Sequence, residues 1–306
     1  MNGKTLYDTN GAVLHAHGGC MLPKDGYFYW FGENRTGRNR VSCYRSKNMK
    51  TWEFRGNVLT LDAQTQEHYV YTERRMTKQV PLPDGRQQIA GCNLERPKVI
   101  YCRKTGKYVM WMHYENGIDY KEAKCAVAVC DTIDGDYLYL GCFSPLGNMS
   151  RDCTLFVDDD ETAYFISAGR ENADTMIYRL TEDYLAIDEQ VRVLWPGQYR
   201  EAAAMFKRNG RYYMITSGCT GWEPNQGKYA VSDSITGRWT QLMDLGDHDT
   251  YRSQPAFVMP SEQADTALYI GDRWNAQNYD ASTYVFFPLR FLPDGTIRLE
   301  DREYFA

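Results

Sequence analysis

The sequence predicts an all-β fold, a five-bladed β-propeller, that occupies residues 1–306 as a single domain. Three observations lead to this prediction. One arrangement of strands and turns recurs five times in units of roughly 45–55 residues, which is typical of propeller blades. The segments contain many of the chain's 24 tyrosines and 7 tryptophans, which favour strands. Helical periodicity is absent apart from a possible short turn near Thr60–Gln66, which argues against alternating β/α folds.

Each unit begins with a polar residue that opens an apolar strand. The predicted opening strands follow in chain order: His15–Gly19, Glu95–Tyr101, Asp152–Val157, Glu201–Phe206 and Gln254–Val258. Each opening strand leads through a short turn rich in Gly, Asp or Asn, or through a polar stretch, into a second strand that is mostly aromatic. These second strands are Tyr27–Phe31, Tyr108–Met112, Ala163–Ser167, Tyr212–Ser217 and Ala267–Ile270. Short apolar runs bounded by turn residues are strands.

The remaining segments of each unit complete the blades on their outer side. They are Arg40–Arg45 with Met49–Trp52, Cys125–Cys130, Met176–Leu180, Lys228–Ser232 with Gly237–Trp239, and Thr283–Leu289 with Arg290–Leu299. One long polar insertion, Gln64–Gly91, interrupts the pattern between the first and second units. We predict a loop or hairpin there, at the rim of the connection between the two blades. Long connections are often functional, and both a role at the pocket rim and plain decoration remain open.

Composition excludes several classes of function. A net charge of −5 without a basic stripe argues against nucleic-acid binding, and no apolar run reaches the roughly 18 residues of a membrane span. The N-terminus lacks a signal-peptide pattern, so we expect a cytoplasmic protein as written, or a secreted one if a leader has been removed. Nine cysteines without C-x-x-C spacing favour buried thiols over zinc sites or a disulfide framework. The sequence does not indicate the oligomeric state.

The polar residues that open the five units are the candidates for function. They are His17, Glu95, Asp152, Glu201 and Gln254. In a propeller the innermost strand of each blade borders the central channel, so these side chains are expected to converge at one end of it. Three carboxylates, an imidazole and an amide are costly to desolvate in one small site unless they bind something.

Clustered carboxylates beside aromatic side chains fit glycoside hydrolysis, because aromatic faces pack against sugar rings. In that reaction one protonated carboxyl group donates to the leaving oxygen while a group on the opposite face activates water. Neighbouring carboxylates raise the pKa of the acid by repulsion. We predict that Glu201 is this acid, held by Asp152 and Glu95.

The chain also resembles a known family over nearly its whole length. The matching segments are HAHGG with YFYWFGEN, CYRSKNMKTW, NLERPKVIY, SRDCTLFVDDDETAYFIS, YREAAAMFKRNGRYYMITSGCTGWEPN, SQPAFVMP, and GDRW with YVFFPL. In this order they resemble glycoside hydrolase family 43, and most closely its exo-β-1,3-galactanase branch. The resemblance implies an inverting exo-hydrolase that releases galactose from the non-reducing end of β-1,3-galactan, without a separate carbohydrate-binding module.

The resemblance also implies roles for single residues. Glu201 matches the general acid, and Asp152 matches the aspartate that tunes its pKa. The first unit has no carboxylate at His15–Gly19, where family members usually carry the base, and in the galactanase branch a glutamine and a glutamate matching Gln254 and Glu95 stand in for it. The expected substrate-binding residues are Arg96, Tyr120, Thr220, Trp222, Trp274, His17 and Glu33.

The expected partner is an oligo- or polysaccharide. No cofactor or catalytic metal is expected, because His15 and His17 alone are too few for a zinc site; a structural cation in the channel remains open. Three alternatives remain: an α-L-arabinofuranosidase or another exo-glycosidase of the same family, a non-catalytic carbohydrate-binding propeller, and a peptide-binding scaffold. The binding propeller predicts that Glu201→Gln leaves function intact.

Overall fold

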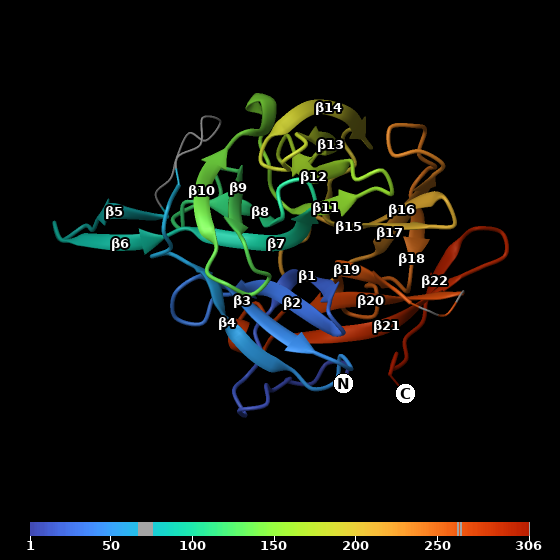
Figure 1. Cartoon of the computed structure of the whole chain (residues 1–306), viewed down its shortest axis with the longest axis horizontal. Helices are drawn as coiled ribbons and strands as arrows, with labels where there is room; N and C mark the ends of the chain where they lie inside the picture. Colours follow the sequence, from blue (N-terminus) through green and yellow to red (C-terminus); the bar gives the residue numbers. More distant parts are fainter. Residues whose placement is uncertain (67–75, 262, 264, 306) are drawn as a thin grey trace.

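The structure, a computed structural model, describes residues 1–66, 76–261, 263 and 265–305. Their strands form five four-stranded sheets and one two-stranded hairpin. Strands that follow one another in a blade are antiparallel neighbours, and the five sheets succeed one another along the chain as the blades of a propeller (Figure 1). The predicted five-bladed β-propeller is therefore confirmed.

Each blade comes from one continuous stretch of chain. Blade 1 contains β1 (His17–Lys24), β2 (Tyr27–Asn34), β3 (Arg40–Ser46) and β4 (Glu53–Thr60). Blade 2 contains β7 (Asn93–Cys102), β8 (Lys107–Glu115), β9 (Lys124–Cys130) and β10 (Leu138–Phe143). Blade 3 contains β11 (Cys153–Val157), β12 (Ala163–Gly169), β13 (Asp174–Leu180) and β14 (Ile187–Leu194).

The last two blades follow the same plan. Blade 4 contains β15 (Arg200–Arg208), β16 (Arg211–Gly218), β17 (Gly227–Ser232) and β18 (Met243–Leu245). Blade 5 contains β19 (Gln254–Pro260), β20 (Thr266–Arg273), β21 (Thr283–Phe291) and β22 (Ile297–Leu299). Two short 3-10 turns, Pro145–Gly147 and Tyr279–Ala281, complete the described elements, and no described helix is long or apolar enough to cross a bilayer.

The structure differs from the sequence-based expectation mainly in the outermost strands. In blade 1 the segment Met49–Trp52 is a turn that ends in an isolated bridge, and the fourth strand follows it. In blade 4 the predicted segment Gly237–Trp239 is not a strand, and the fourth strand β18 follows it. The strands β10, β14 and β18 were not predicted. The strand β14 is mostly exposed, so its sequence carries little of the apolar signal that marks a strand, whereas β10 is apolar and mostly buried and solvent exposure does not explain why it was missed. At Thr60–Gln66 the described residues form a turn at Leu61–Asp62 and no helix.

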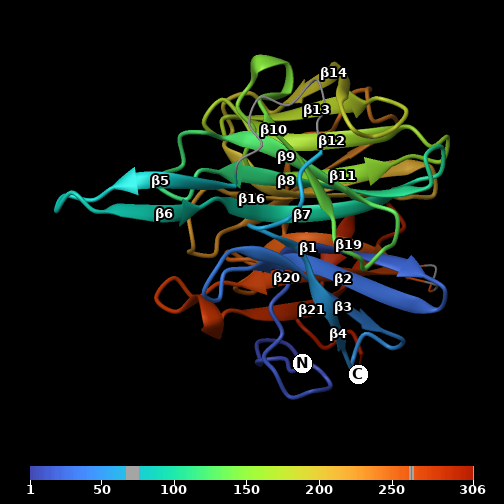
Figure 2. The same ribbon diagram turned by 60° about the vertical axis from the view of Figure 1, so that its left-hand side comes forward.

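The insertion between blades 1 and 2 ends in a hairpin. Its strands are β5 (Thr77–Pro81) and β6 (Gln87–Gly91), and they extend away from the five blades in both views (Figures 1 and 2). The predicted hairpin is therefore observed for this part of the insertion, while residues 67–75 lie outside the described residues. Lys78 at its base pairs with Glu122 of blade 2 at 2.7 Å.

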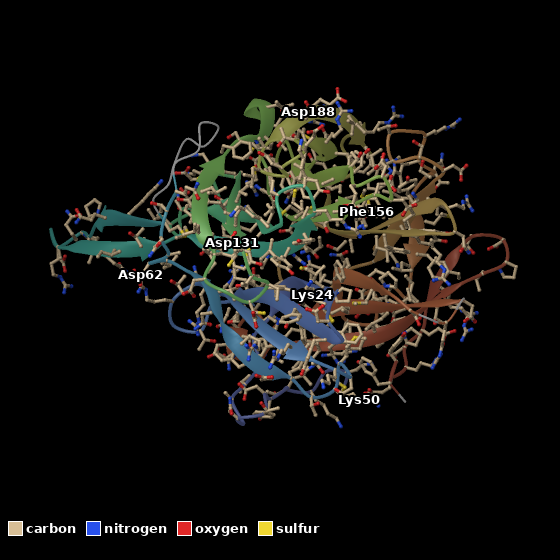
Figure 3. All side chains as sticks on the ribbon, viewed as in Figure 1. Lys24, Lys50, Asp62, Asp131, Phe156 and Asp188 are labelled. Atoms are coloured by element: carbon tan, nitrogen blue, oxygen red, sulfur yellow. The ribbon has the colours of Figure 1, made fainter. Side chains whose placement is uncertain are left out.

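Alternating side chains of each strand pack toward the two neighbouring blades. In β8, for example, Met110 and Met112 belong to the core between blades 1 and 2, whereas Val109 and Trp111 belong to the core between blades 2 and 3. Five such cores occur, one at each interface between successive blades, and the fifth joins blade 5 to blade 1. Side chains fill these interfaces, while the labelled Lys50, Asp62 and Asp188 lie at the periphery (Figure 3).

The two ends of the chain meet beside blades 1 and 5 (Figure 2). The amino group of Met1 pairs with Glu303, and the amide of Gly3 donates to the carbonyl of Tyr284 at 2.8 Å. The ring of blades is therefore closed by side-chain packing between blade 5 and blade 1, each of which comes from one stretch of chain. The two terminal segments lie across this interface.

Candidate active site

A β-bulge turns the opening residue of several blades toward the channel. In β1, β7 and β15 the pairing register shifts just after His17, Glu95 and Glu201. The next residue in each case has a left-handed backbone, with φ of 60° at Gly18, 54° at Arg96 and 52° at Ala202. A bulge re-aims side chains and is common next to active sites, so the repeated polar residue in the sequence corresponds to a repeated backbone device.

Four of the five opening residues line one pocket of about 360 Å³. We call this cavity the central pocket. Its lining residues are Glu33, Arg35, Glu95, Arg96, His113, Tyr120, Arg151, Asp152, Asn172, Glu201, Cys219, Gly221, Trp222, Gln254 and Trp274. Of the predicted site residues, Thr220 and His17 do not line it. The hydroxyl of Thr220 instead donates to the carbonyl of Glu223 at 2.6 Å.

His17 lies behind the pocket wall with no exposed surface. Its Nδ1 is 3.0 Å from Oδ1 of Asp272, and its ring stacks on Tyr284 with centroids 4.5 Å apart. The other oxygen of Asp272 accepts from the amide of Gly18 at 2.9 Å. The structure therefore gives His17 a structural position at the junction of blades 1 and 5 and no contact surface for a sugar.

Glu201 has the electrostatics of a general acid. Burial first, and then the negative charge of Asp152, raise its pKa to about 7, against the opposing effects of Arg96, the Cys219 thiol and the Gln254 amide. Its Oε1 accepts from Nε2 of Gln254 at 3.0 Å, and its Oε2 lies 3.4 Å from Nδ2 of Asn172. A carboxyl group with this pKa keeps its proton in neutral or mildly acidic solution and can donate it.

Gln254 uses both ends of its amide in direct contacts. Its Nε2 donates to Glu201 and to Oγ of Ser217 at 3.1 Å. Its Oε1 accepts from Nε1 of Trp274 at 2.7 Å and from the guanidinium of Arg96. These contacts fix the amide with its nitrogen toward the acid. A neutral amide oxygen is a very weak base, so Gln254 is a poor site for accepting a proton from water.

Asp152 is joined to the acid through the backbone and through Arg96. Its Oδ2 accepts from the amide of Ala202 at 3.2 Å, directly after Glu201, and lies 3.0 Å from Nε of Arg96. Arg96 also donates to the carbonyl of Pro255 at 3.0 Å. One buried guanidinium thus links blades 3 and 5 around the acid on blade 4.

Glu95 occupies the opposite kind of environment. Although burial alone would raise its pKa, Arg35, His113 and Tyr120 hold that pKa far below the usual range. Nη2 of Arg35 lies 2.7 Å from Oε1 of Glu95, and the Tyr120 hydroxyl donates to the same oxygen. Glu95 is therefore an ionised carboxylate over the whole working pH range.

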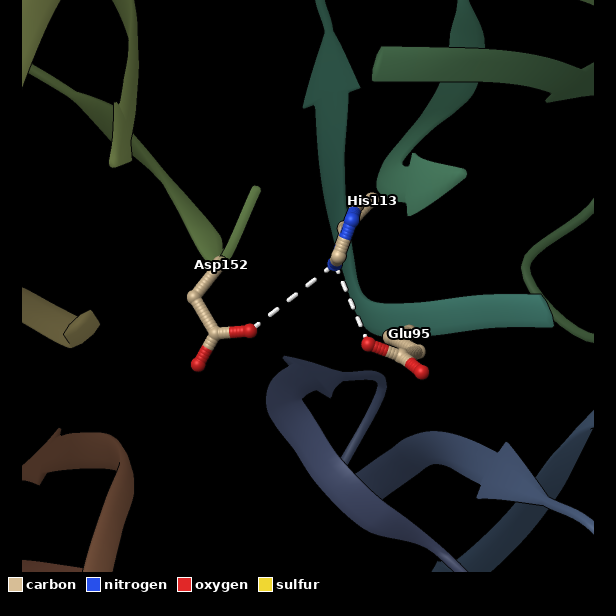
Figure 4. Close-up of side chains that lie close together, drawn as sticks. All are labelled: Glu95, His113 and Asp152. Atoms are coloured by element: carbon tan, nitrogen blue, oxygen red, sulfur yellow. Dashed lines mark ion pairs between the residues drawn. The ribbon is translucent and has the colours of Figure 1, made fainter. Parts of the chain in front are cut away.

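His113 supports Glu95 from the paired position on β8 (Figure 4). Its Nδ1 lies 3.1 Å from Oε2 of Glu95 and 3.9 Å from Oδ1 of Asp152, and its Nε2 lies 3.0 Å from Glu115. Burial lowers the pKa of His113, but Glu115 and Glu95 raise it more, to about 9. The imidazole is therefore a cation at neutral pH.

By residue type, Glu95, His113 and Asp152 could hold a metal ion, since their ligand atoms lie within 4.8 Å of one another. The charges do not fit one. Both ring nitrogens of His113 already lie beside carboxylates, 3.1 Å from Glu95 and 3.0 Å from Glu115, and Arg96 already neutralises Asp152. We therefore assign these side chains to an ion-pair network, and the absence of a catalytic metal stays a prediction.

Glu33 shares Arg35 with Glu95. Its Oε1 lies 3.2 Å from Nε of Arg35. The Cζ atom of Arg35 lies 5.7 Å from the ring centroid of Trp222. Burial, together with the neighbouring Glu95 and Asp272, raises the pKa of Glu33 to about 7 despite Arg35. The two carboxyl groups that share the Arg35 guanidinium therefore differ in protonation below neutral pH: Glu95 is ionised and Glu33 is protonated.

Two strained turns support the acid side of the pocket. Residues 170–172 and 250–252 each have three successive left-handed residues, with φ between 48° and 62°. Such conformations cost energy and gather at functional sites. The first turn carries Asn172 to Glu201, and the second directly precedes Ser253 and Gln254.

Comparison with known proteins identifies the family of this pocket. The model of the glycosyl hydrolases of family 43 matches residues 96–250. The chain is 45% identical to an exo-β-1,3-galactanase from Clostridium thermocellum, with a TM-score of 0.86, covering 97% of this chain and 64% of that one. It is 33% identical to an exo-β-1,3-galactanase from Phanerochaete chrysosporium solved with β-1,3-galactotriose, with a TM-score of 0.85 and coverage of 98% and 66%.

A third similar structure has nearly the same length as this chain. It is a family 43 β-1,3-galactosidase solved with galactodeoxynojirimycin, 32% identical, with a TM-score of 0.84 and 98% coverage of both chains. The chain thus spans slightly less than two thirds of each of the two galactanases. No curated protein sequence matches it.

Sequence reasoning missed five charged or polar lining residues, namely Arg35, His113, Arg151, Asn172 and Cys219. One signal was available for His113: it is a charged residue in an apolar strand, YVMWMHYE, where solvent exposure is not expected. No periodic signal marks Asn172, which reaches the pocket only because of the strained turn.

Proposed function

The chain belongs to the glycosyl hydrolases of family 43, and from this we propose that it is an inverting exo-hydrolase that releases galactose from the non-reducing end of β-1,3-galactan. The observation that carries the proposal is the contrast between two carboxyl groups in one pocket. Glu201 has a pKa of about 7 and keeps a proton, whereas Glu95 is held ionised by Arg35 and His113. An inverting glycosidase needs one group of each kind.

In the proposed reaction Glu201 donates its proton to the oxygen of the scissile glycosidic bond as the bond to the anomeric carbon breaks. Gln254 and Asn172 hold the two carboxyl oxygens, so the acid is oriented before the sugar arrives. Asp152 keeps the pKa of Glu201 raised while Arg96 fixes the position of Asp152. Galactan carrying one sugar fewer leaves with the proton of Glu201.

A water molecule attacks the anomeric carbon from the opposite face, and its proton passes to Glu95. Glu95 is ionised at the pH at which Glu201 is still protonated, so it can receive this proton as the water attacks, although Arg35, His113 and Tyr120 make it a weaker base than a free carboxylate. Both ends of the Gln254 amide already make hydrogen bonds. We therefore give Gln254 the role of orienting Glu201, and it does not share the role of base with Glu95. The product is galactose in the α configuration, and the cycle closes when Glu95 releases its proton to solvent and Glu201 takes one up from solvent.

The names of the similar proteins support the choice of sugar and linkage. Proteins of 32–45% identity are called exo-β-1,3-galactanases or a β-1,3-galactosidase. An exo-1,5-α-L-arabinanase, by contrast, is only 16% identical, with a TM-score of 0.63, and shares the fold alone. A galactosyl substrate is therefore better supported than an arabinofuranosyl one.

Incubation with β-1,3-galactotriose, β-1,4-galactotriose and an aryl α-L-arabinofuranoside tests the proposal, with products separated by chromatography. We expect galactose and galactobiose from the β-1,3-linked trisaccharide, followed by complete conversion to galactose, and little product from the other two. Preferential cleavage of the arabinofuranoside would show that the protein is an α-L-arabinofuranosidase. No cleavage of any substrate, with tight binding of galactotriose, would support a binding propeller.

A further inference from the structure

A second cavity at the rim of blades 3 and 4 has the chemistry of an anion-binding groove. Its volume is about 510 Å³, and it is lined by the end of β14, the loop that follows it, Lys228 on β17 and the segment before β18. Every charged residue that lines it is basic, namely Arg192, Lys228 and Arg238. This is unusual in a chain with a net charge of −5. We call it the rim groove.

Among the described residues, two of these cations have no carboxylate to neutralise them. Lys228 pairs with Asp244. Arg192 and Arg238 are exposed, and within the part of the chain that the structure describes neither has a carboxylate oxygen within 4 Å. An arginine presents a planar fork of donors that matches a carboxylate. The two unpaired arginines therefore favour a carboxylate ligand.

The floor of the groove is aromatic and rigid. Trp195 and Trp239 meet edge to face with centroids 6.4 Å apart, and both are largely buried. Nε1 of Trp239 donates to the carbonyl of Ile235 at 3.1 Å, which fixes that ring. The amide side chains of Gln198 and Gln241 border the floor. The buried rings therefore form a rigid base, and the exposed amides and arginines beside it are the groups that can bind an acidic sugar chain.

Hydrogen bonds join the loop that lines this groove to the turn beside the general acid. Asn172 contacts Glu201, and the carbonyl of the next residue, Ala173, accepts from the amide of Tyr199 at 3.4 Å. Tyr199 is 54% exposed and follows Gln198, which lines the groove. The loop is anchored from the other side, where the amide of Gly197 donates to Asp174 at 3.0 Å.

The loop that lines the groove leads outward from the side of Glu201. A general acid stands beside the oxygen that leaves, so the remainder of a polysaccharide departs on the side of Glu201. The groove borders β14, which lies three strand spacings, about 14 Å, outward from the opening strand of blade 3. A chain that leaves the central pocket past Asn172 and Tyr199 reaches it within a few sugar units.

We propose that the rim groove is a distal binding site for carboxylate-bearing sugars in the leaving portion of the substrate. The inference rests on the proposed function and extends it from a neutral galactan to an acidic one. Arg192 and Arg238 bind the carboxylate of a uronic acid substituent several units from the bond that is cleaved. The site adds affinity for the acidic polymer and takes no part in the chemical step.

The test compares a neutral β-1,3-galactooligosaccharide with one of the same length that carries uronic acid substituents distant from its non-reducing end. The variant is the double substitution Arg192→Gln with Arg238→Gln. The control is Arg86→Gln with Arg298→Gln, which removes the same charge at exposed sites elsewhere. We expect the groove variant to lose about five- to tenfold in kcat/KM on the acidic substrate, through KM and with kcat unchanged, as for two exposed charge contacts.

The neutral substrate should be cleaved equally, within twofold, by the wild type and both double variants, and added salt should remove the preference of the wild type. Equal losses on both substrates, or no loss on the acidic one, would overturn the groove proposal while leaving the proposed function intact. If the wild type cleaved neither substrate, the proposed function would fail. Calorimetric titration of Glu201→Gln with the acidic oligosaccharide would then decide the groove separately, because arginine-dependent binding supports it and its absence refutes it.

Discussion

The side-chain nitrogen of Gln254 lies 3.0 Å from a carboxyl oxygen of Glu201, so the amide and the proposed acid form one hydrogen-bonded unit. The oxygen of the same amide is held by Arg96 and Trp274. The sequence alone does not distinguish the residue that orients the acid from the residue that accepts the proton of water, and this arrangement does. Gln254 orients the acid, and an ionised carboxylate elsewhere in the pocket must receive the proton of water.

The pH dependence of kcat/KM should report the proton on Glu201. Because burial and Asp152 raise its pKa to about 7, the active protonated form predominates below that pH, and activity should fall about tenfold per unit above it. In Asp152→Asn the repulsion is lost, so the alkaline limb should move to lower pH. Rates measured from pH 4 to 9 check this. An alkaline limb that stayed in place in the variant would remove Asp152 from the tuning of the acid.

Substitution of the acid should depend on the leaving group. We expect Glu201→Gln to lose roughly 10²–10⁴-fold on β-1,3-galactan oligosaccharides, since an alkoxide leaves poorly without a proton. An aryl β-galactoside with an acidic phenol needs less help, so its loss should be much smaller. Steady-state rates on both substrates make the comparison, with Glu182→Gln as an exposed carboxylate control. Equal activity of variant and wild type on galactan would favour the non-catalytic alternative.

Chemical rescue should separate Glu95 from Gln254. Removal of the proposed base in Glu95→Ala leaves a space in which azide can replace water, because azide needs no base. With an activated aryl β-galactoside we expect α-galactosyl azide and partial recovery of the rate. Gln254→Ala should slow the reaction through a misplaced acid and should not form the azide product. Mass spectrometry and NMR identify the product; azide formed only by Gln254→Ala would reverse the assignment.

The charge on His113 should appear in the stability of the protein. Its pKa is raised from 6.5 to about 9 by Glu115 and Glu95, so the stabilisation is complete below about pH 6.5 and is lost as the pH rises to about 9. The loss should be on the order of 2–3 kcal/mol in the free energy of unfolding. Denaturant titrations between pH 6 and 9.5 measure it. His113→Gln should be less stable at pH 6.5 and should lack this slope, whereas an equal slope in both proteins would contradict it.

Much of this architecture could be predicted from the sequence because the inner strands of a propeller are buried on both faces. Their apolar and aromatic runs, such as β8 and β12, recur with turn residues between them, and five repeats predict five blades. The outermost strands carry less information. The strand β14 reads IDEQVRVL and has five exposed residues out of eight, so its polarity conceals it.

The pocket could be predicted in part for a related reason. Glu95, Asp152, Glu201 and Gln254 open successive blades, and the chain positions alone predict that they converge. His113 enters through the register of β7 against β8, where it pairs with Glu95, and register cannot be read from single strands. His17 is buried outside the central pocket through its contact with Asp272, which lies far away in the sequence. The burial of His17 could therefore not be predicted from the sequence.

The stereochemistry of the first product tests the central claim most directly. Proton NMR of β-1,3-galactotriose during the first minutes of hydrolysis, before mutarotation, distinguishes the two anomers of released galactose. The pairing of Glu201 as acid with Glu95 as base predicts α-galactose first and β-galactose only later. Early accumulation of β-galactose would contradict it, because retention requires a covalent intermediate that this assignment does not include.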